Sequence, residues 1–570
     1  MENQKNLILA VVLSIVVLLI FDFFFKPKKD EILKDEMSTK ADLSNNDIIN
    51  KSNEGLEPSL KGLSSDVTDN LKEIKEERVF FDMKRIKGSI NLYGATLDDI
   101  ILKDHRNSLD KDSTQVRVLS RENSESPYLI RMGWASNNTT EMPGKNTLWK
   151  TNKKQYKDSE KIILTWKNKD NILFKREIFI DENFMFTVND FIGNNSDKTL
   201  NVSNYSYIQR RNYRPANKFF ILHEGPLGVF NETLKEVSYD EIEEKGTISE
   251  KSTNGWIGIT DHYWQVSIFP KTDESFKARF KNIKNQKNSI QVDFINENLK
   301  ILKPGETISS SSYIFAGAKE VELIDRYMED LKISKFDLSI DFGWFYFLTK
   351  PLFYALNYLA NLFSNFGIGI IVLTFFIRIF MFPLANKSFK SMNNMRILTP
   401  EIQRIRERFK DDKTRMNQEM FKLYKDKKIN PAAGCLPILI QIPIFFALYK
   451  VLFVSIEMRH APFFGWIKDL SAPDPTSIFN LFGLIAWDPP SILGIGIWPI
   501  IMGATMYLQQ KLNPPPPDPI QAKIFLMLPF IFTFLLATFP AGMVIYWTFN
   551  NVLSIAQQAF LLKKQEQQRK

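Results

Sequence analysis

Long apolar stretches alternate with polar ones along this chain, and their lengths predict membrane spans. Residues 7–25 form a run of 19 that only Ser14 and Asp22 interrupt, about the length that the hydrocarbon core of a bilayer requires of a helix. Five more such stretches follow at residues 365–385, 435–456, 491–511, 524–539 and 541–562. The pattern therefore predicts a multi-pass α-helical membrane protein with six spans.

The first stretch, within residues 1–25, is predicted to be an uncleaved anchor. A cleaved signal peptide has a basic start and small residues before its cleavage site, whereas here Lys5 is the only early base and three phenylalanines precede Lys26. Residues 26–75 are rich in Lys, Asp, Glu, Asn and Ser and poor in aromatic residues. Such a composition cannot bury a core, so this segment is predicted to be a flexible tether.

Residues 76–340 change to short runs of alternating apolar and polar residues, such as KIILTW, FMFTVNDFI and SIQVDFI. A period of two predicts strands with one buried face, and we therefore expect a large antiparallel β-sandwich domain. Residues 341–364 then carry Lys350 and Pro351 among aromatic residues. That mixture suits an amphipathic helix at the membrane surface better than a span.

Residues 386–431 carry a helical pattern between the second and third spans. Apolar residues recur at spacings of three and four before and after a KDDKT turn: Met395, Leu398, Ile402, Ile405 and Phe409, then Met416, Met420 and Leu423. This periodicity predicts a hairpin of two antiparallel amphipathic helices. Thr399, Pro400 and Glu401 resemble a cap, a first-turn proline and a first-turn acid, so the first helix is expected to bend or restart there.

The distribution of charge predicts the orientation of the spans. The net charge of +9 is made up of −3 up to Gly343 and +12 after it. The hairpin holds 13 Lys and Arg and the tail of residues 563–570 holds 4, whereas the loop of residues 457–490 between the third and fourth spans holds 2. Because basic loops stay in the cytoplasm, both termini and the hairpin are expected to be cytoplasmic, and the β-domain and the 457–490 loop are expected to lie on the opposite, periplasmic side.

Motifs for catalysis, metal binding and nucleotide binding are missing from the sequence. Cys435 is the only cysteine, and there is no HExxH, GxSxG or phosphate-binding loop. His223 beside Glu224 is the one candidate catalytic pair in the β-domain, although isolated histidines are usually structural. We therefore predict that the protein is not an enzyme and that it uses neither a cofactor nor a metal.

Arg378 is the most informative residue of the membrane part. It precedes Ala385 by seven residues, or roughly 10 Å at 1.5 Å per residue, so it lies inside the second span on its cytoplasmic half. No Asp or Glu occurs in spans two to six to neutralise it. The same inner halves carry other polar residues: Thr374, Gln441, Thr505, Gln509, Gln510, Ser554, Gln557 and Gln558.

A charged guanidinium at this depth needs water, a counter-charge or the headgroup region. Snorkelling to the headgroups is the simplest solution, but the surrounding polar residues favour a water-filled groove that opens to the cytoplasm. The outer halves of the spans are apolar, so the groove would end partway and would not form a pore. Such a groove lowers the cost of bringing a polar segment of another chain into the bilayer, and its charge attracts acidic residues.

Several motifs resemble the YidC family of membrane-protein insertases. They are PLANKSFKSMNNMRILTPEIQ after Arg378, INPAAGCLPILIQIPIFFALYKVL, FPAGMVIYWTFNNVLSIAQQ and, less specifically, WIGITDHYWQVSIFP and DFGWFYFLTKPL. The resemblance covers nearly the whole chain. It implies five core spans within residues 365–385 and 432–562 plus an anchor, a periplasmic β-supersandwich, a cytoplasmic hairpin and a groove with a functional arginine.

The resemblance also implies site residues and partners. Substrate contacts carried over by position are Thr374, Tyr546 and Trp547, where many relatives have a second tyrosine in place of Trp547; with Arg378, Gln441 and Gln557 these form the predicted groove. Gln441, Pro443 and Cys435 match family positions that we interpret as structural. The implied partners are nascent membrane proteins, the Sec translocon, membrane lipids and, through the hairpin, the ribosome, and the implied location is the cell inner membrane.

Some alternatives stay open at this point. A small-solute transporter could use Arg378 as an anion site, although no internal repeat supports it, and the β-domain could be a carbohydrate enzyme. The basic hairpin could contact anionic lipid or an acidic docking partner. The periplasmic loop carries a longer apolar insert, assigned to residues 476–495 from the stretch SIFNLFGLIAWDPPSILGIG at 477–496, which could lie on the membrane or extend the fourth span.

Overall fold

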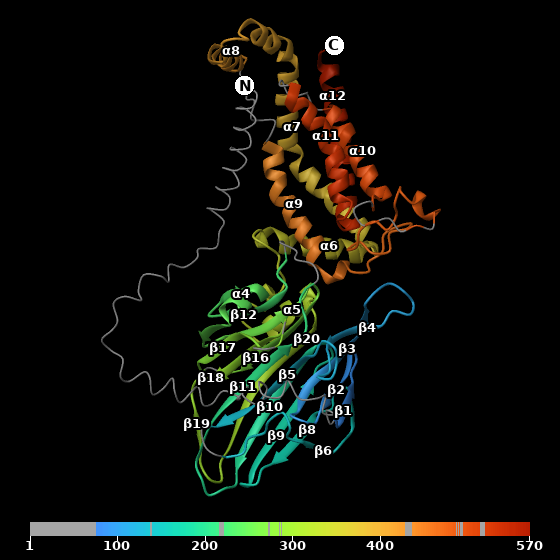
Figure 1. Cartoon of the computed structure of the whole chain (residues 1–570). Helices are drawn as coiled ribbons and strands as arrows, with labels where there is room; N and C mark the ends of the chain where they lie inside the picture. The colour runs from blue at the N-terminus through green and yellow to red at the C-terminus, as the bar shows by residue number, and fades with distance from the viewer. Residues whose placement is uncertain are drawn as a thin grey trace, which may run out of the picture. The chain divides into compact units, whose positions relative to one another are not determined.

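The computed structural model describes residues 76–569 apart from 137–139, 216–221, 272–273, 284–285, 287, 428–435, 486, 488–489, 491–493 and 513–518. The predicted anchor, the predicted tether and Cys435 therefore lie outside the described residues. The described chain forms a β-rich part followed by a helical part (Figure 1).

The first sheet has eleven strands. Its main path runs β14-β17-β18-β11-β5-β3-β2-β1-β7, with β19 paired to β11 and β4 paired to β3. Its strands are β1 (Arg78–Asp82), β2 (Ile86–Asn91), β3 (Thr96–Arg106), β4 (Gln115–Leu119), β5 (Tyr128–Ser136), β7 (Gln155–Lys157), β11 (Leu200–Arg210), β14 (Thr247–Ser252), β17 (Phe276–Asn282), β18 (Ile290–Asn296) and β19 (Lys300–Leu302).

The second sheet has nine strands in the order β13-β12-β15-β16-β20-β10-β9-β8-β6. They are β6 (Lys150–Thr151), β8 (Ile162–Lys167), β9 (Ile172–Ile180), β10 (Met185–Asn194), β12 (Gly225–Phe230), β13 (Thr233–Glu236), β15 (Gly255–Thr260), β16 (Trp264–Lys271) and β20 (Thr307–Ala318). The pairs are antiparallel apart from β1 with β7, which is parallel.

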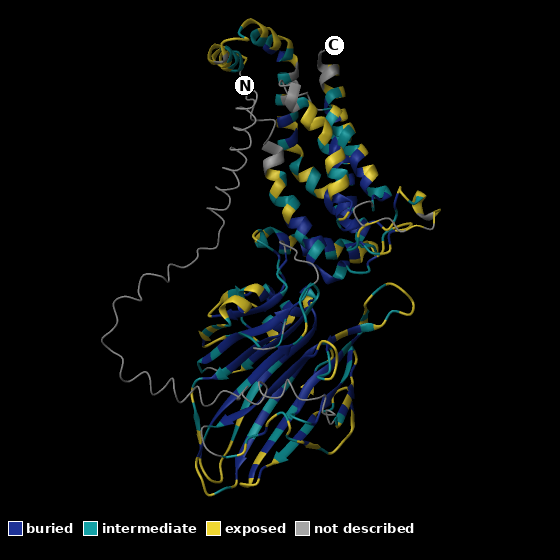
Figure 2. Cartoon of the chain, viewed as in Figure 1, coloured by how far each residue is buried: buried dark blue, intermediate teal, exposed yellow. Residues whose placement is uncertain are grey.

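The alternation in the sequence places the core between the two sheets. In β5, Ile130, Met132 and Trp134 belong to one buried apolar cluster, whereas Arg131 between them takes the other face, as the two-residue period of a strand requires. Trp256 of β15 and Phe174 of β9 are fully buried in the same cluster, and burying such a side chain contributes ~2 kcal/mol. Figure 2 shows the strands as the most continuously buried part of the chain. The predicted β-sandwich is thus confirmed.

Short helices accompany the sheets and lead into the helical part. They are α4 (Tyr239–Lys245), α5 (Val321–Asp330) and the 3₁₀ turn η1 (Phe336–Ser339). Helix α6 (Tyr346–Phe363) follows, and its Lys350 pairs with Asp325 of α5 at 2.8 Å. Its exposed side includes Phe347, Tyr358 and Leu362, and the placement of residues 341–364 at the membrane surface stays a prediction.

The helical part consists of α7 (Phe366–Arg408), α8 (Lys413–Asp426), α9 (Leu436–Val454), α10 (Ile497–Leu512), α11 (Pro519–Leu536) and α12 (Ala541–Arg569), with the 3₁₀ turns η3 (Ile456–Met458) and η4 (Leu481–Gly483). Within the described residues, one stretch, Phe366–Ser391, is a helix long and apolar enough to cross a membrane. Ile440–Val454 and Ala522–Leu536 are shorter apolar helices.

The structure differs from the sequence prediction at the start of the hairpin. Helix α7 continues through Pro383 and Pro400 to Arg408, and the Thr399 hydroxyl donates to the carbonyl of Met395 within the same helix. Thr399 therefore does not cap a new helix, and the expected restart does not occur. The second helix of the hairpin, α8, does begin with a cap, because the side chain of Asp412 accepts from the amide of Arg415 at 3.0 Å.

Polar contacts join the β-domain to α9 and the turn after it. Lys450 of α9 pairs with Asp341 at 2.7 Å, and Glu457 accepts a hydrogen bond from the backbone amide of Val321 at 3.0 Å. The second carboxylate oxygen of Glu457 is buried and has no hydrogen-bond partner in the described part of the chain. Burial raises the pKa of Glu457 to about 7.

Candidate functional site

Arg378 is held by the last helix. Helices α7 and α12 pack against each other (Figure 1), and Nε of Arg378 donates to Oδ1 of Asn550 at 2.8 Å. Its Nη2 donates to the backbone carbonyl of Asn550 at 3.3 Å, and that carbonyl also accepts from the hydroxyl of Ser554 at 2.7 Å. The Asn550 side chain is 8% exposed, so this contact fixes the guanidinium between two packed helices.

These contacts position the charge of Arg378 without neutralising it. A guanidinium has five N–H groups, and the hydrogen bonds above use Nε and Nη2 only. Among the residues that the structure describes, no Asp or Glu pairs with Arg378 and nothing accepts from its Nη1. A neutral amide orients the group, and a full positive charge remains available to another molecule.

Tyr546 and Gln441 lie beside this arginine. Tyr546 is 3% exposed and lies one turn before Asn550 on α12, close enough to Arg378 for an electrostatic interaction. Gln441 on α9 lies close enough to Tyr546 for a polar side-chain interaction. Three of the predicted site residues, Arg378, Gln441 and Tyr546, thus meet where α7, α9 and α12 come together.

The other three predicted site residues have different surroundings. The hydroxyl of Thr374, one turn before Arg378, donates to the carbonyl of Ile370 in its own helix at 2.6 Å and is buried. Trp547 stacks edge-on against Phe445 of α9 with ring centroids 4.8 Å apart and also contacts Phe532 of α11. Its ring is therefore part of the packing between helices.

Gln557 lies further along α12. It follows Asn550 by seven residues, which corresponds to roughly 10 Å of helix. Its amide nitrogen is buried and has no hydrogen-bond partner within the described residues. The structure thus places Gln557 on the same helix as the Arg378 cluster but beyond its contacts.

Asn550 and Asn551 are the site residues that the sequence reasoning missed. These adjacent residues form hydrogen bonds with different helices. Asn550 accepts from Arg378 of α7, whereas Nδ2 of Asn551 donates to the hydroxyl of Thr505 on α10 at 3.2 Å. Two adjacent asparagines inside an apolar span are a signal in themselves, since a polar side chain at membrane depth needs a partner. Asn550 is a neutral acceptor and not a counter-ion, so a pattern of charges does not reveal it.

The candidate catalytic pair in the β-domain is not formed. The ring of His223 hydrogen-bonds to the carbonyl of Pro226 at 2.9 Å, whereas Glu224 accepts from the backbone amide of His262 at 2.9 Å. The two side chains thus satisfy separate backbone groups, which is a structural role. In the described ranges, no group of three or more His, Cys, Asp or Glu side chains could hold a metal ion.

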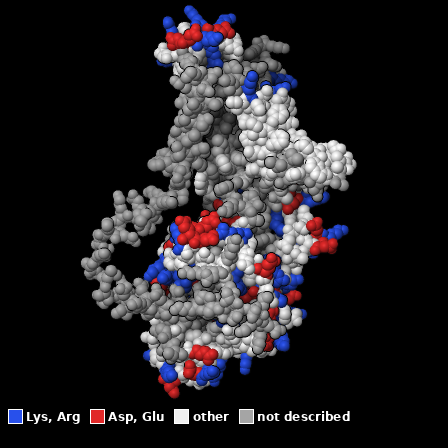
Figure 3. Space-filling model, viewed as in Figure 1, with Lys and Arg blue, Asp and Glu red and all other residues white. Residues whose placement is uncertain are grey.

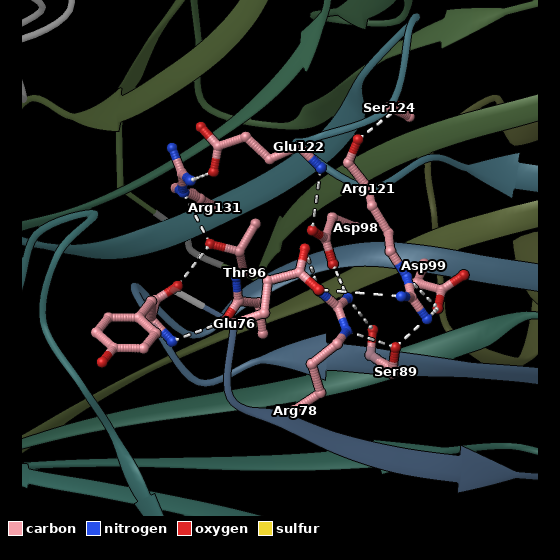
Figure 4. Close-up of polar contacts among 12 residues, drawn as sticks. Glu76, Arg78, Ser89, Thr96, Asp98, Asp99, Arg121, Glu122, Ser124 and Arg131 are labelled. Atoms are coloured by element: carbon pink, nitrogen blue, oxygen red, sulfur yellow. Dashed lines mark hydrogen bonds and ion pairs between the residues drawn. The ribbon is translucent and has the colours of Figure 1, made fainter. Parts of the chain in front are cut away.

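A second polar cluster in the β-domain is structural as well. Figure 4 shows that Asp98 and Asp99 of β3 point at arginines from neighbouring strands and loops. Asp98 pairs with Arg78, and Asp99 accepts from Arg121 at 2.9 Å and from Ser89 at 2.8 Å. Both aspartates are buried, so the cluster neutralises charges within the sheet and leaves no free acid or base.

Charged side chains are concentrated away from the helices of the site. Figure 3 shows Lys, Arg, Asp and Glu gathered over the α7–α8 hairpin and over the β-domain, whereas the described helical surface that faces the viewer between them is nearly free of charge. Lys427 at the end of α8 lies 3.9 Å from Glu401 of α7, an exposed pair that contributes little to stability.

Comparisons with known proteins agree along the whole chain. Residues 78–355 match the family model described as YidC periplasmic domain, and residues 358–568 match the one described as 60Kd inner membrane protein. The chain is 44% identical over 569 residues to the membrane protein insertase YidC of Rickettsia rickettsii (strain Iowa), covering 99% of both chains. It is 45% identical over 567 residues to that of Rickettsia prowazekii (strain Madrid E), again covering 99% of both.

A solved structure also matches. It is described as an active YidC insertase crystal structure with the first transmembrane domain resolved, and it shares 18% identity with this chain, at a TM-score of 0.35. The match covers 85% of this chain and 92% of that one.

Proposed function

Because this chain belongs to the YidC family of membrane protein insertases, we propose that it inserts its clients along the polar face formed by Arg378, Gln441, Tyr546 and Asn550. Its function as an insertase, its place in the inner membrane and its periplasmic domain follow from the family. The family is not enzymatic, which agrees with the structural roles of His223 and Glu224 and removes the carbohydrate enzyme from consideration.

The observation that carries the proposal is the guanidinium of Arg378, which Asn550 holds but does not neutralise. Two unit charges 4 Å apart attract by ~1 kcal/mol in bulk water and by ~4 kcal/mol where the effective dielectric constant is about 20. An acidic residue of a client is therefore attracted to this site more strongly than it would be at an exposed surface.

The same face lowers the barrier for the polar part of a client. A polar segment that enters lipid without partners loses its hydrogen bonds with water, whereas the half-buried Arg378 and Gln441 offer it a charge and an amide on the proposed polar face. The apolar part of the client then moves sideways into lipid, driven by the burial of its own apolar surface. This step requires no nucleotide.

In the proposed topology the chain has six spans, with both termini and the α7–α8 hairpin in the cytoplasm. Helix α7 supplies a stretch long enough to cross the membrane, and α9 and α11 contain shorter apolar helices. The 13 basic residues of 386–431 support the cytoplasmic placement of the hairpin. Residues 1–25 serve as the amino-terminal anchor and residues 26–75 as the tether.

The proposed partners follow from the same surfaces. Nascent membrane proteins meet the Arg378 face, either with the Sec translocon or without it. The basic hairpin meets anionic lipid headgroups, and ribosomal RNA is the other acidic partner that its charge would attract. The short basic tail of residues 563–570 continues α12 and adds charge to the same side.

Depletion of the protein in cells tests this function. Single-span proteins with short acidic periplasmic tails should stay accessible to protease on the wrong side of the membrane after depletion, and re-expression of the full chain should restore them. A soluble cytoplasmic protein of similar size is the control for general loss of synthesis. Unchanged insertion of such clients after depletion would contradict the proposal.

A further inference from the structure

The loop between α9 and α10 contains a segment with many exposed apolar side chains. Its exposed residues are large and uncharged, and Leu484 at its tip is 86% exposed. We name this segment the apolar loop, and its members are Ile478, Phe479, Leu481, Phe482, Leu484, Ile485 and Trp487. Soluble surfaces rarely leave a contiguous apolar patch of this kind in water.

The base of the apolar loop is fixed to the start of α10. Asp474 accepts through Oδ1 from the amide of Thr476 at 3.0 Å and through Oδ2 from the amide of Trp498 at 2.9 Å. The hydroxyl of Thr476 accepts from the amide of Ile497 at 3.0 Å. Because the first amides of a helix have no partner within it, these two side chains cap α10 and tie the loop to its first turn.

The tip of the loop is a defined turn. The amide of Phe482 donates to the carbonyl of Ser477 at 2.8 Å, and that of Ile485 donates to the carbonyl of Asn480 at 3.0 Å. Leu481 and Phe482 have φ of 49° and 60°, a left-handed backbone that bulky residues rarely adopt. The backbone of Leu481 and Phe482 is thus strained, and in this conformation both side chains are exposed.

The sequence left open whether the apolar insert at 476–495 lies on the membrane or extends the fourth span, and the position of α10 decides between the two. Helix α10 begins at Ile497, and η4 with its left-handed residues interrupts any helical path before it. The insert therefore does not lengthen the fourth span. It is a separate element beside the start of that span.

We propose that the apolar loop is a lipid-binding element that inserts its tip into the periplasmic leaflet next to α10. Residues 477–487 carry no charge, so nothing in the loop opposes entry into the interface. The lipid-facing character continues along α10, where Ile500 and Ile501 are also exposed. Trp487 at the end of the loop is the kind of residue that is enriched at membrane interfaces.

The occupant follows from where the loop is attached. Both ends of the loop lead to membrane helices, and Asp474 and Thr476 hold it at the outer end of α10, where lipid is the most abundant apolar partner. The inference rests on the membership of an inner-membrane family and is independent of the role proposed for Arg378. An element of this kind would hold the outer ends of α9 and α10 at a constant depth.

Site-directed spin labelling of the full chain in liposomes of phosphatidylethanolamine and phosphatidylglycerol tests the proposal. A label at Leu484→Cys, in a Cys435→Ser background, should collide several-fold more often with oxygen than with a water-soluble nickel chelate, as a label within lipid does. The matched control is Lys468→Cys, an exposed position of the same periplasmic loop, whose label should show the opposite preference.

Two results would overturn the proposal. Equal access of the nickel chelate to the labels at residues 484 and 468 would mean that the loop stays in water. Dipolar broadening between labels at residue 484, lost on dilution with unlabelled protein, would mean that a second copy of the chain covers the loop instead of lipid. Because Leu484 is exposed, its replacement leaves the fold intact, and restoration of growth in depleted cells checks this for each variant.

Discussion

The side-chain oxygen of Asn550 accepts a hydrogen bond from Nε of Arg378 over 2.8 Å, and this contact joins the first and the last helix of the membrane part. An amide and a carboxylate have nearly the same shape but differ by one unit of charge. Asn550 therefore orients the guanidinium as an aspartate would, yet leaves its positive charge intact.

Replacing Asn550 by Asp tests whether that free charge is needed. The Asn550→Asp carboxylate should pair with Arg378 and cancel its attraction for acidic clients. We therefore expect the insertion of these clients to fall roughly tenfold. This corresponds to a loss of ~1.4 kcal/mol, which lies within the range that Coulomb's law gives for two unit charges. Protease protection of an acidic-tailed client in depleted cells measures it.

Asn551→Asp is the matched control for that variant. It adds the same carboxylate one residue later, where the side chain faces Thr505 of α10 and not Arg378. We expect it to reduce insertion of acidic-tailed and neutral-tailed clients alike, through the cost of a buried charge. Equal effects of the two aspartates on both kinds of client would show that the charge of Arg378 plays no special part.

The insertion activity of Arg378 variants should depend on whether the positive charge is kept. Arg378→Ala should impair acidic-tailed clients, whereas Arg378→Lys should retain part of the activity because it keeps the charge but loses the planar donor pair that Asn550 receives. Insertion of a client with a neutral tail provides the comparison. Wild-type behaviour of both variants would mean that the fixed charge is not the working element.

Trp547 is expected to act through packing. Its ring contacts Phe445 and Phe532, so Trp547→Ala should destabilise the helical part by about 3–5 kcal/mol through the cavity that it leaves. Trp547→Phe should cost much less. Thermal unfolding of the purified chain in detergent measures both, and an Ala variant as stable as wild type would show that this tryptophan is free to contact clients.

Glu457 predicts a pH dependence of stability. Its pKa of about 7 in the folded chain lies above its ordinary value of 4.5, so the folded state holds a proton that the unfolded state releases, and stability falls as the pH rises from about 4.5 to 7. Glu457→Gln keeps an acceptor for the amide of Val321 and removes the charge. We expect it to raise the melting temperature at pH 8 but to change it little at pH 4.5; an equal change at both pH values would contradict a buried carboxylate.

The parts of the structure that follow from local patterns were predictable from the sequence. The strands of the sandwich follow the two-residue alternation, as in β5, and the apolar stretches coincide with α7 and α9–α12. Thr399 and Pro400 show where local signals fail, because they resemble a helix start and yet lie inside α7. Packing of the hairpin outweighs a cap that contributes only ~1 kcal/mol.

The site was predictable only in part, for a physical reason. Arg378 stands out because a charge in a span is expensive. Tyr546 lies near Arg378 and Gln441 lies near Tyr546, and the substrate contacts expected of them stay predictions. Asn550 is distant from Arg378 in the sequence, and no local pattern links the two. Whether a hydroxyl such as that of Thr374 faces a client or its own helix depends on a rotamer that the sequence does not encode.

The most direct test of the central claim uses the purified chain in liposomes, without nucleotide or any other protein. The measured quantity is the rate at which a single-span client with an acidic tail inserts, compared with the same client whose tail Asp and Glu are changed to Asn and Gln. The account predicts that wild-type protein favours the acidic tail and that Asn550→Asp removes the preference. Equal rates for both tails with wild-type protein, or a preference that survives in Asn550→Asp, would contradict it.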